Sequence, residues 1–131
     1  MSSKEKSYKS YELYCSFALN RLVAELNINV YQDWEEDKIN DILAQQKGVS
    51  KGDIKYEIKS NNYMTNKVLS KLEKEGLIES VRLEDRYNIK ITKKGLLHVK
   101  KFNEFYWEMF SEHIIQHYKY RKLPIWFEKL K

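Results

Sequence analysis

Glycine and proline are scarce in this chain, and their scarcity limits the folds that it can adopt. The 131 residues include only 4 glycines and 1 proline. Because these two residue types end helices and shape tight turns, we expect long helices joined by few turns. The length is that of one domain, which we expect to cover residues 1–131.

Composition excludes several classes of protein. Hydrophobic residues make up 42% of the chain and charged residues 33%, which is typical neither of disordered tails nor of membrane proteins. No apolar run approaches the roughly 18 residues that cross a bilayer, and residues 1–9 hold no apolar signal-peptide core. We therefore expect a cytoplasmic protein with no membrane partner, associated with the nucleoid or, if viral, located in the host cytoplasm.

Basic residues gather in the second part of the chain. Residues 48–131 hold 18 of the 24 lysines and arginines but 11 of the 19 acidic residues, and the net charge is +5. A basic face on a small domain favours a polyanionic partner, usually nucleic acid. The alternative interpretation is an ordinary solvated surface rich in lysine.

Apolar residues recur at steps of three and four along most of the chain, which is the spacing of helices with one buried face. Asp33 with Glu36, and Ser50 with Asp53, fit capping boxes that start two of these helices. Gly48 is expected to end the second helix in a left-handed cap. The expected helices cover residues 7–27, about 34–46, about 50–59, about 62–75 and about 93–120.

Two short β-like runs follow the fourth expected helix, which stops at Gly76. The runs cover residues 77–83 and 86–92, and apolar and polar residues alternate in the second. Only two residues separate them, so they predict a β-hairpin. Residues 125–127 form an apolar C-terminal tag beyond the single proline.

The order of helix, short helix, polar turn, helix and hairpin is that of a winged helix-turn-helix. A helix fits the major groove of DNA, where the base edges display a distinct code of donors and acceptors. The preceding helix braces it, and the hairpin places basic side chains on the DNA backbone. We predict a mainly α fold with a small β-hairpin wing, with residues 33–92 as the winged-helix core. Residues 7–32 would form an N-terminal helix with its connector, and residues 93–131 a C-terminal dimerisation helix and tail.

Two strings carry a resemblance to a known family. Residues 68–79, VLSKLEKEGLIE, resemble the end of the recognition helix and the first wing strand of MarR-like winged-helix regulators. Residues 84–86, followed by ITKKG at 91–95, resemble their wing tip and the start of their next helix. The match covers about residues 33–100, and many archaeal and viral regulators share such strings. The resemblance implies a homodimer that is built from the terminal helices and binds double-stranded DNA.

The resemblance also implies which residues contact DNA. Tyr63, Asn66 and Lys67 would read bases, since an asparagine amide can bond an adenine edge with both of its polar atoms. Later residues of the helix and those of the wing would contact phosphate, which positions the protein without reading sequence. The predicted DNA-binding residues are Asn62, Tyr63, Asn66, Lys67, Ser70, Lys71, Lys74, Arg82, Arg86 and Lys90.

Aromatic residues are dense in the last third of the chain and occupy more than one stripe of the long helix. One helix on one small core cannot bury them all, and soluble monomers avoid large apolar patches. A two-fold dimer is the expected solution. The alternative is that the helix over 7–27 covers both stripes within one chain. The predicted interface residues are Tyr11, Cys15, Phe102, Tyr106, Met109, Phe110 and Ile114.

Other candidate sites are weak. His113 and His117 lie four residues apart, a spacing that can bind metal, but no acidic or cysteine set accompanies them. Cys15 is the single cysteine, which excludes intrachain disulfides and zinc sites built on cysteines, and we expect it to be a small core or interface residue. No catalytic motif stands out, so we predict neither an enzyme nor a cofactor. The leading hypothesis is a sequence-specific regulator of transcription, and the alternatives are a winged-helix module that binds a protein and a non-specific architectural DNA binder.

Overall fold

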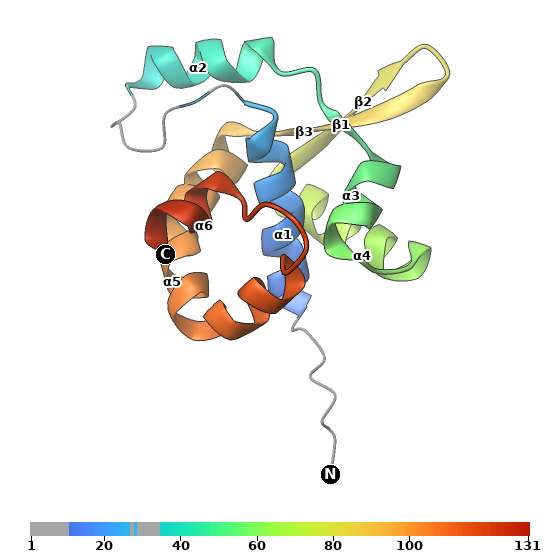
Figure 1. The fold of residues 1–131 in the computed structure, drawn as a ribbon. Coiled ribbons are helices and arrows are strands. Elements are labelled where there is room, and N and C mark those ends of the chain that lie inside the picture. Colours follow the sequence, from blue (N-terminus) through green and yellow to red (C-terminus); the bar gives the residue numbers. More distant parts are fainter. Residues whose placement is uncertain (1–10, 27, 29–34) are drawn as a thin grey trace.

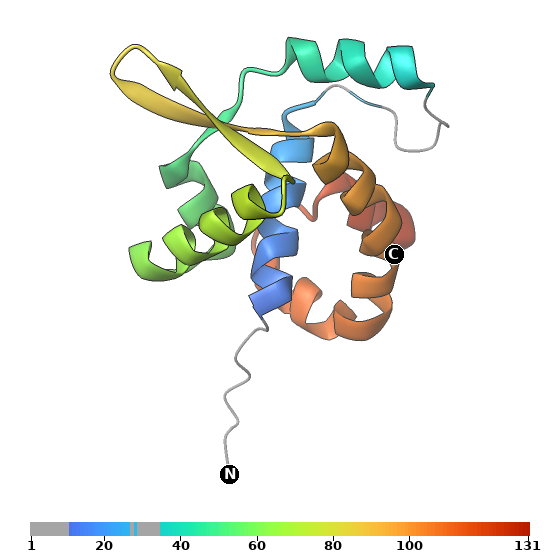
Figure 2. The same ribbon diagram turned by 180° about the vertical axis from the view of Figure 1, so that it is seen from behind.

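The described part of the chain is built around one central helix. The computed structural model describes residues 11–26, 28 and 35–131. Its elements in chain order are α1 (Tyr11–Ala24), α2 (Glu36–Gln45), β1 (Val49–Ser50), α3 (Lys51–Ile58), α4 (Asn62–Lys74), β2 (Ile78–Leu83), β3 (Arg86–Ile91), α5 (Lys93–His117) and α6 (Ile125–Leu130). Figures 1 and 2 show α1 in the middle, with α3 and α4 on one side and α5 and α6 on the other. No helix among these residues has both the length and the apolar character to cross a membrane.

Three short strands form an antiparallel sheet in the order β1-β3-β2. β2 and β3 pair along their whole length as the predicted hairpin, which projects from the body of the molecule in Figure 1. β1 was not predicted, and it pairs with β3 through Val49 opposite Ile89. Two residues are too few to show the alternation of apolar and polar residues by which a sequence predicts a strand. β1 is therefore defined only by its pairing with β3.

The elements around the sheet form a winged helix-turn-helix. A connection of three residues, 59–61, joins α3 to α4, and the hairpin follows α4 directly. The predicted fold class, mainly helical with a small β-hairpin wing, is therefore confirmed, with one strand more than expected. The order of helix, short helix, turn, helix and hairpin that the sequence predicted is present in the structure.

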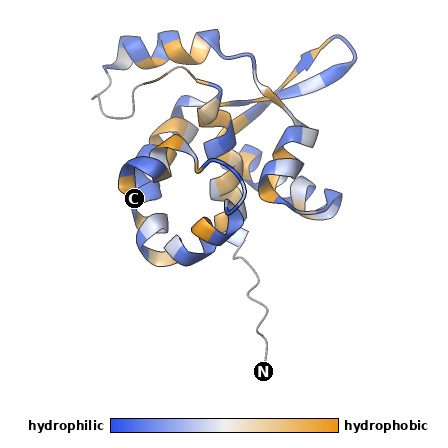
Figure 3. Cartoon of the chain, in the orientation of Figure 1, coloured by the Kyte–Doolittle hydropathy of each residue, from blue (hydrophilic) through white to orange (hydrophobic). Residues whose placement is uncertain are grey.

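α1 is a core helix and not the amphipathic surface helix that the apolar spacing predicted. Every residue from Cys15 to Asn20 is buried. A helix that is buried on all sides needs neighbours on all sides, and here α3 and α4 pack against one face while α5 packs against another. Figure 3 shows hydrophobic residues on α1, α5 and α6, whereas the loop between α5 and α6 is largely hydrophilic.

A buried pair of asparagines joins α1 to α5. The Asn20 amide nitrogen donates to the Asn103 side-chain oxygen at 3.1 Å, and the Asn103 amide nitrogen donates to the Asn20 side-chain oxygen at 2.9 Å. Asn20 also donates to the Ser16 carbonyl oxygen at 2.9 Å. Because buried amides must be paired, this reciprocal contact fixes one register between the two helices.

The capping residues agree with the sequence at some helix ends and differ at others. The predicted cap Asp33 and the connector at 29–32 lie outside the described residues, and the residue that precedes α2 is Glu35. The Ser50 side chain accepts a hydrogen bond from the Asp53 amide at 3.1 Å, as the capping box predicts. Gly48 lies three residues beyond the end of α2 and approaches Asn88 and Ile89, so its place is set by the sheet and not by the helix end.

The string at 91–95 has a clear structural role. The Thr92 hydroxyl accepts from the Gly95 amide at 3.0 Å and donates to the Gly76 carbonyl oxygen at 2.6 Å, so one side chain caps α5 and ties it to the end of α4. A Cβ atom at residue 95 would lie 2.0 Å from the Leu77 carbonyl oxygen. Only glycine allows this close approach between α5 and the start of the wing.

The C-terminal part folds back on the chain instead of extending as one helix. α5 is kinked at Phe110 (φ −132°, ψ 22°) and ends at His117, before the predicted end near residue 120. The apolar tag forms α6, in which Trp126 and Phe127 are buried, and the rings of Trp107 and Phe127 lie 6.1 Å apart. Tyr118, Trp126 and Phe127 are buried within one chain, whereas Phe105 and Tyr120 remain exposed. The alternative to a dimer, in which the helix over 7–27 covers both stripes, therefore accounts for only part of the aromatic surplus.

Candidate nucleic-acid interface

Both ends of α4 are fixed by specific hydrogen bonds. The Asn61 side-chain oxygen accepts from the Met64 amide at 2.8 Å and caps the first turn. At the other end Gly76 has a φ of 76°, and the Leu77 amide donates to the Leu72 carbonyl oxygen at 2.9 Å. This is the six-residue bond of a Schellman motif, and it leads the chain directly into the wing. The predicted stop at Gly76 is confirmed.

α4 has one buried face and one solvent-exposed face. Thr65, Val68 and Leu72 are buried against the core, with Met64 and Leu69 half-buried beside them. The predicted base-reading residues lie on the opposite side, and Tyr63 is 73% exposed. The exposed residues of this outer face are Asn62, Tyr63, Asn66, Lys67, Ser70, Glu73 and Lys74.

Lys71 lies at the edge of this face and is half-buried. Its ammonium bonds the Glu75 carboxylate at 3.0 Å, and this hydrogen bond raises the pKa of Lys71. Tyr11 borders the same edge, because its hydroxyl donates to the Lys67 carbonyl oxygen at 2.8 Å and its ring centroid lies 5.0 Å from the Lys67 ammonium. The structure thus places Tyr11, a predicted dimer residue, beside α4, and it places Lys71 in an ion pair instead of on the open face.

A cation–aromatic pair stiffens the wing. Arg82 and Tyr87 lie opposite each other in the hairpin, and the guanidinium lies 5.5 Å from the ring centroid. Arg82 also donates to the Tyr87 hydroxyl and to the Glu84 carbonyl oxygen, each at 3.2 Å. Because side chains alternate along a strand, this pair shares the sheet face of Ile89 and Ile91. The sequence reasoning missed Tyr87, which the register of the hairpin could have identified.

The wing is less basic than predicted. Its two-residue tip consists of Glu84 and Asp85, both exposed, and Arg82 and Arg86 flank them. The four charges sum to zero, and Lys90 pairs across the hairpin with the acidic residue 79. The open positive charge of this region therefore lies on α4, where Lys67 and Lys74 are exposed, rather than at the wing tip.

The predicted dimer residues divide into two groups. Cys15 and Ile114 are buried in the core of one chain, where a partner subunit could not touch them. Phe102, Tyr106 and Phe110 are half-buried on α5. Met109 is 61% exposed, and it shares one face of α5 with two exposed apolar residues that the sequence reasoning missed, Leu97 and Phe105.

The weaker sequence signals are structural. His117 is buried, stacked on Phe17 at 4.0 Å between ring centroids, and its Nε2 lies 2.7 Å from the Glu57 carbonyl oxygen. His113 instead lies against Phe110, with the ring centroids 6.4 Å apart. Among the described residues no group of three metal-ligating side chains occurs. Burial raises the pKa of the Cys15 thiol to about 12, so this cysteine is a core residue.

Comparison with known proteins returns distant structural similarities. No protein-family model matches the chain, and no curated protein matches its sequence. MepR, a transcription regulator of the Staphylococcus aureus multidrug efflux pump MepA, is 23% identical over 83% of this chain and 84% of its own, with a TM-score of 0.43. The PcaV transcriptional regulator from Streptomyces coelicolor is 14% identical over 82% and 84%, with a TM-score of 0.38. The winged-helix assignment of this chain rests on its own element order and strand register.

Proposed function

We propose that the protein binds double-stranded DNA through the outer face of α4 and the wing, and that it regulates transcription as a homodimer. The observation that carries the proposal is the outer face of α4. A helix fixed at both ends presents amide, hydroxyl, phenol and ammonium groups side by side, and all of them are exposed. Such a helix can enter the major groove without rearrangement, because its inner face already packs on the core.

The positions along α4 suggest a division of roles. Tyr63 and Asn66 lie in the first half of the helix, where recognition helices contact base edges. Asn66 can bond an adenine edge with both polar atoms of its amide. Ser70 and Lys74 lie farther along the same face and suit phosphate contacts. Lys71 contributes less, because its ammonium is already paired with a carboxylate.

The apolar face of α5 supports a second subunit. Leu97, Phe105 and Met109 are exposed, and steps of eight and four residues place them on one side of the helix, with the exposed Lys101 between Leu97 and Phe105. A second copy would cover this face and present two recognition helices to successive major grooves, about 34 Å apart. The preferred site would then be an inverted repeat with half-sites about ten base pairs apart.

Fluorescence anisotropy with labelled duplexes tests the proposal. If three to six phosphates are contacted, affinity falls roughly tenfold to a thousandfold between 50 and 200 mM salt. Asn66→Ala is expected to cost about 1–3 kcal/mol on a selected site and little on random DNA. Lys74→Ala is expected to weaken both and to lower the salt slope by about one. Lys47→Ala, an exposed lysine between α2 and β1, is the matched control and leaves affinity unchanged.

Two results would count against this assignment. Absence of binding to any duplex at low salt would favour the protein-binding module. Equal losses on selected and random DNA for Asn66→Ala would indicate an architectural binder that reads no sequence.

A further inference from the structure

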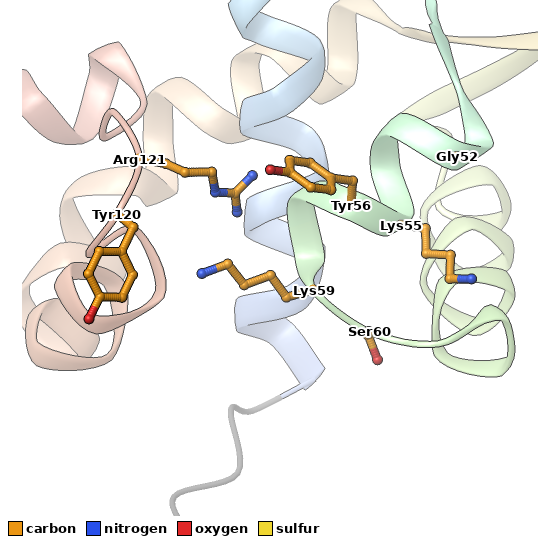
Figure 4. Close-up of a pocket in the computed structure, with 7 residues that line it drawn as sticks. All are labelled: Gly52, Lys55, Tyr56, Lys59, Ser60, Tyr120 and Arg121. Atoms are coloured by element: carbon orange, nitrogen blue, oxygen red, sulfur yellow. The ribbon is translucent and has the colours of Figure 1, made fainter.

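A cleft of about 540 Å³ lies between α3 and the turn that follows α5, apart from the outer face of α4 (Figure 4). Its volume is that of a site for a small ligand. The residues that line it come from two parts of the chain about 60 positions apart: Lys55, Tyr56, Lys59 and Ser60 from α3 and its end, and Tyr120 and Arg121 from the C-terminal turn. None of these described lining residues carries a carboxylate.

Two tyrosines present open aromatic surface at this cleft. Tyr120 is 85% exposed and Tyr56 is 69% exposed, which is unusual for such large side chains. The Arg121 guanidinium lies 4.9 Å from the Tyr56 ring centroid and holds that ring in place. Figure 4 shows Tyr56 and Arg121 pointing toward each other, with Tyr120 on the C-terminal side of the cleft. The rings are therefore platforms on which a planar group can stack.

Cations lie between and beside these platforms. Lys59 extends from the end of α3 toward Tyr120 and Arg121 (Figure 4), and its ammonium donates to the His117 carbonyl oxygen at 2.5 Å. A lysine ammonium has three donors, so two remain for a ligand. Lys59 has a φ of 53°, a left-handed conformation that glycine or asparagine usually occupies at a helix end. A lysine at this strained position keeps its charge in the cleft.

One carboxylate beside the cleft is already occupied. Glu57 accepts a hydrogen bond from the Tyr118 hydroxyl at 2.5 Å and pairs with the Arg121 guanidinium at 3.5 Å. Arg121 is thereby anchored at the back of the cleft. Two further exposed lysines, 119 and 122, flank this segment of the turn. The cleft therefore keeps an excess of positive charge and favours an anionic ligand.

We propose that this cleft binds a nucleotide unit, with its phosphate at Lys59 and its base stacked on Tyr120 or Tyr56. Cations that hold the backbone, combined with aromatic rings that stack bases, are the general means by which proteins bind unpaired nucleotides. A small inorganic anion would leave the aromatic platforms unused. The bases of an intact duplex are stacked on each other, so duplex DNA does not fit. The ligand is either a free nucleotide or an unpaired nucleic-acid strand, and the site is separate from the duplex-binding face of α4.

Anisotropy titrations with two probes distinguish these sources: fluorescein-labelled hexathymidylate for the strand, and ATP carrying a methylanthraniloyl fluorophore for the free nucleotide. Tyr120→Ala is expected to weaken binding of the responding probe about five- to hundredfold, the range for loss of one stacking partner. Lys59→Gln, which removes the charge and keeps a polar side chain, is expected to weaken it through loss of a phosphate contact. Lys47→Ala, which removes an exposed lysine between α2 and β1, is the matched control and leaves probe binding unchanged. Circular dichroism verifies the fold of each variant.

Each outcome of these titrations either supports or overturns the proposed nucleotide site. A response to hexathymidylate that Tyr120→Ala weakens assigns the cleft to an unpaired strand, and the same result with the ATP probe alone assigns it to a free nucleotide. The proposal is overturned if neither probe binds at low salt, or if Tyr120→Ala and Lys59→Gln both bind as the wild type does. It is also overturned if Tyr120→Ala weakens duplex binding as much as probe binding. Since duplex binding is followed separately through Asn66→Ala, either proposal can fail without the other.

Discussion

The buried asparagine pair between α1 and α5 gives a prediction whose size follows from the hydrogen bonds. Asn20→Ala would leave both the oxygen and the nitrogen of the Asn103 amide without the partners that Asn20 supplies. Asn103→Ala would leave only the Asn20 side-chain oxygen unpaired, because the Asn20 nitrogen keeps its bond to the Ser16 carbonyl oxygen at 2.9 Å. The two truncations are therefore not equivalent, although each removes one member of the same pair.

A buried polar atom without a partner costs about 1–3 kcal/mol. Alanine returns up to about 0.7 kcal/mol through its higher helix propensity. We therefore expect Asn103→Ala to lower the free energy of unfolding by about 1–2 kcal/mol, and Asn20→Ala to lower it by about 2–4 kcal/mol. In the double variant no unpaired amide remains, so its loss is expected to fall short of the sum by about 1 kcal/mol or more.

Urea denaturation followed by circular dichroism at pH 7 measures all four proteins of this cycle. Equal slopes of the free energy against urea concentration would show that the variants unfold in the same way. The reasoning is refuted if the two single losses are equal, or if the losses add to within about 0.3 kcal/mol.

Three further predictions follow from the core, the apolar face of α5 and the wing. Burial raises the pKa of the Cys15 thiol from 9.0 to about 12, so its contribution to stability is complete below pH 9 and is lost as pH rises toward 12. Chemical denaturation from pH 8 to 11 measures this loss of stability. Iodoacetamide is expected to label Cys15 only after unfolding. Met109→Asp places a charge on the exposed apolar face of α5 and is expected to shift a dimer to a 15.9 kDa monomer in sedimentation, so a wild-type monomer at micromolar concentration would contradict the dimer. Glu84→Gln with Asp85→Asn removes two carboxylates from the wing tip and is expected to tighten duplex binding and steepen its salt dependence, whereas unchanged affinity would mean that the tip does not approach the phosphates.

Local signals in the sequence determined the order of elements and the ends of several of them. A serine three residues before Asp53, and the glycine at position 76, act through hydrogen bonds that span only one helical turn. The outer face of α4 was predictable for the same reason, because the spacing of Val68 and Leu72 alone decides which side of the helix is buried. The winged helix could therefore be read from short stretches of the chain.

Packing between distant segments decided the rest. β1 forms because Val49 pairs with Ile89 of β3, and a segment of two residues carries no sequence pattern that predicts this pairing. The kink at Phe110 turns α5 back toward α6, and α6 then packs against Trp107, part of the aromatic surplus for which the sequence favoured a dimer. The cleft unites Lys59 and Tyr120, which lie on segments that only the folded chain brings together. Each of these features depends on contacts across roughly 20 to 60 residues of sequence, where local periodicity carries no information and packing in three dimensions selects the neighbours.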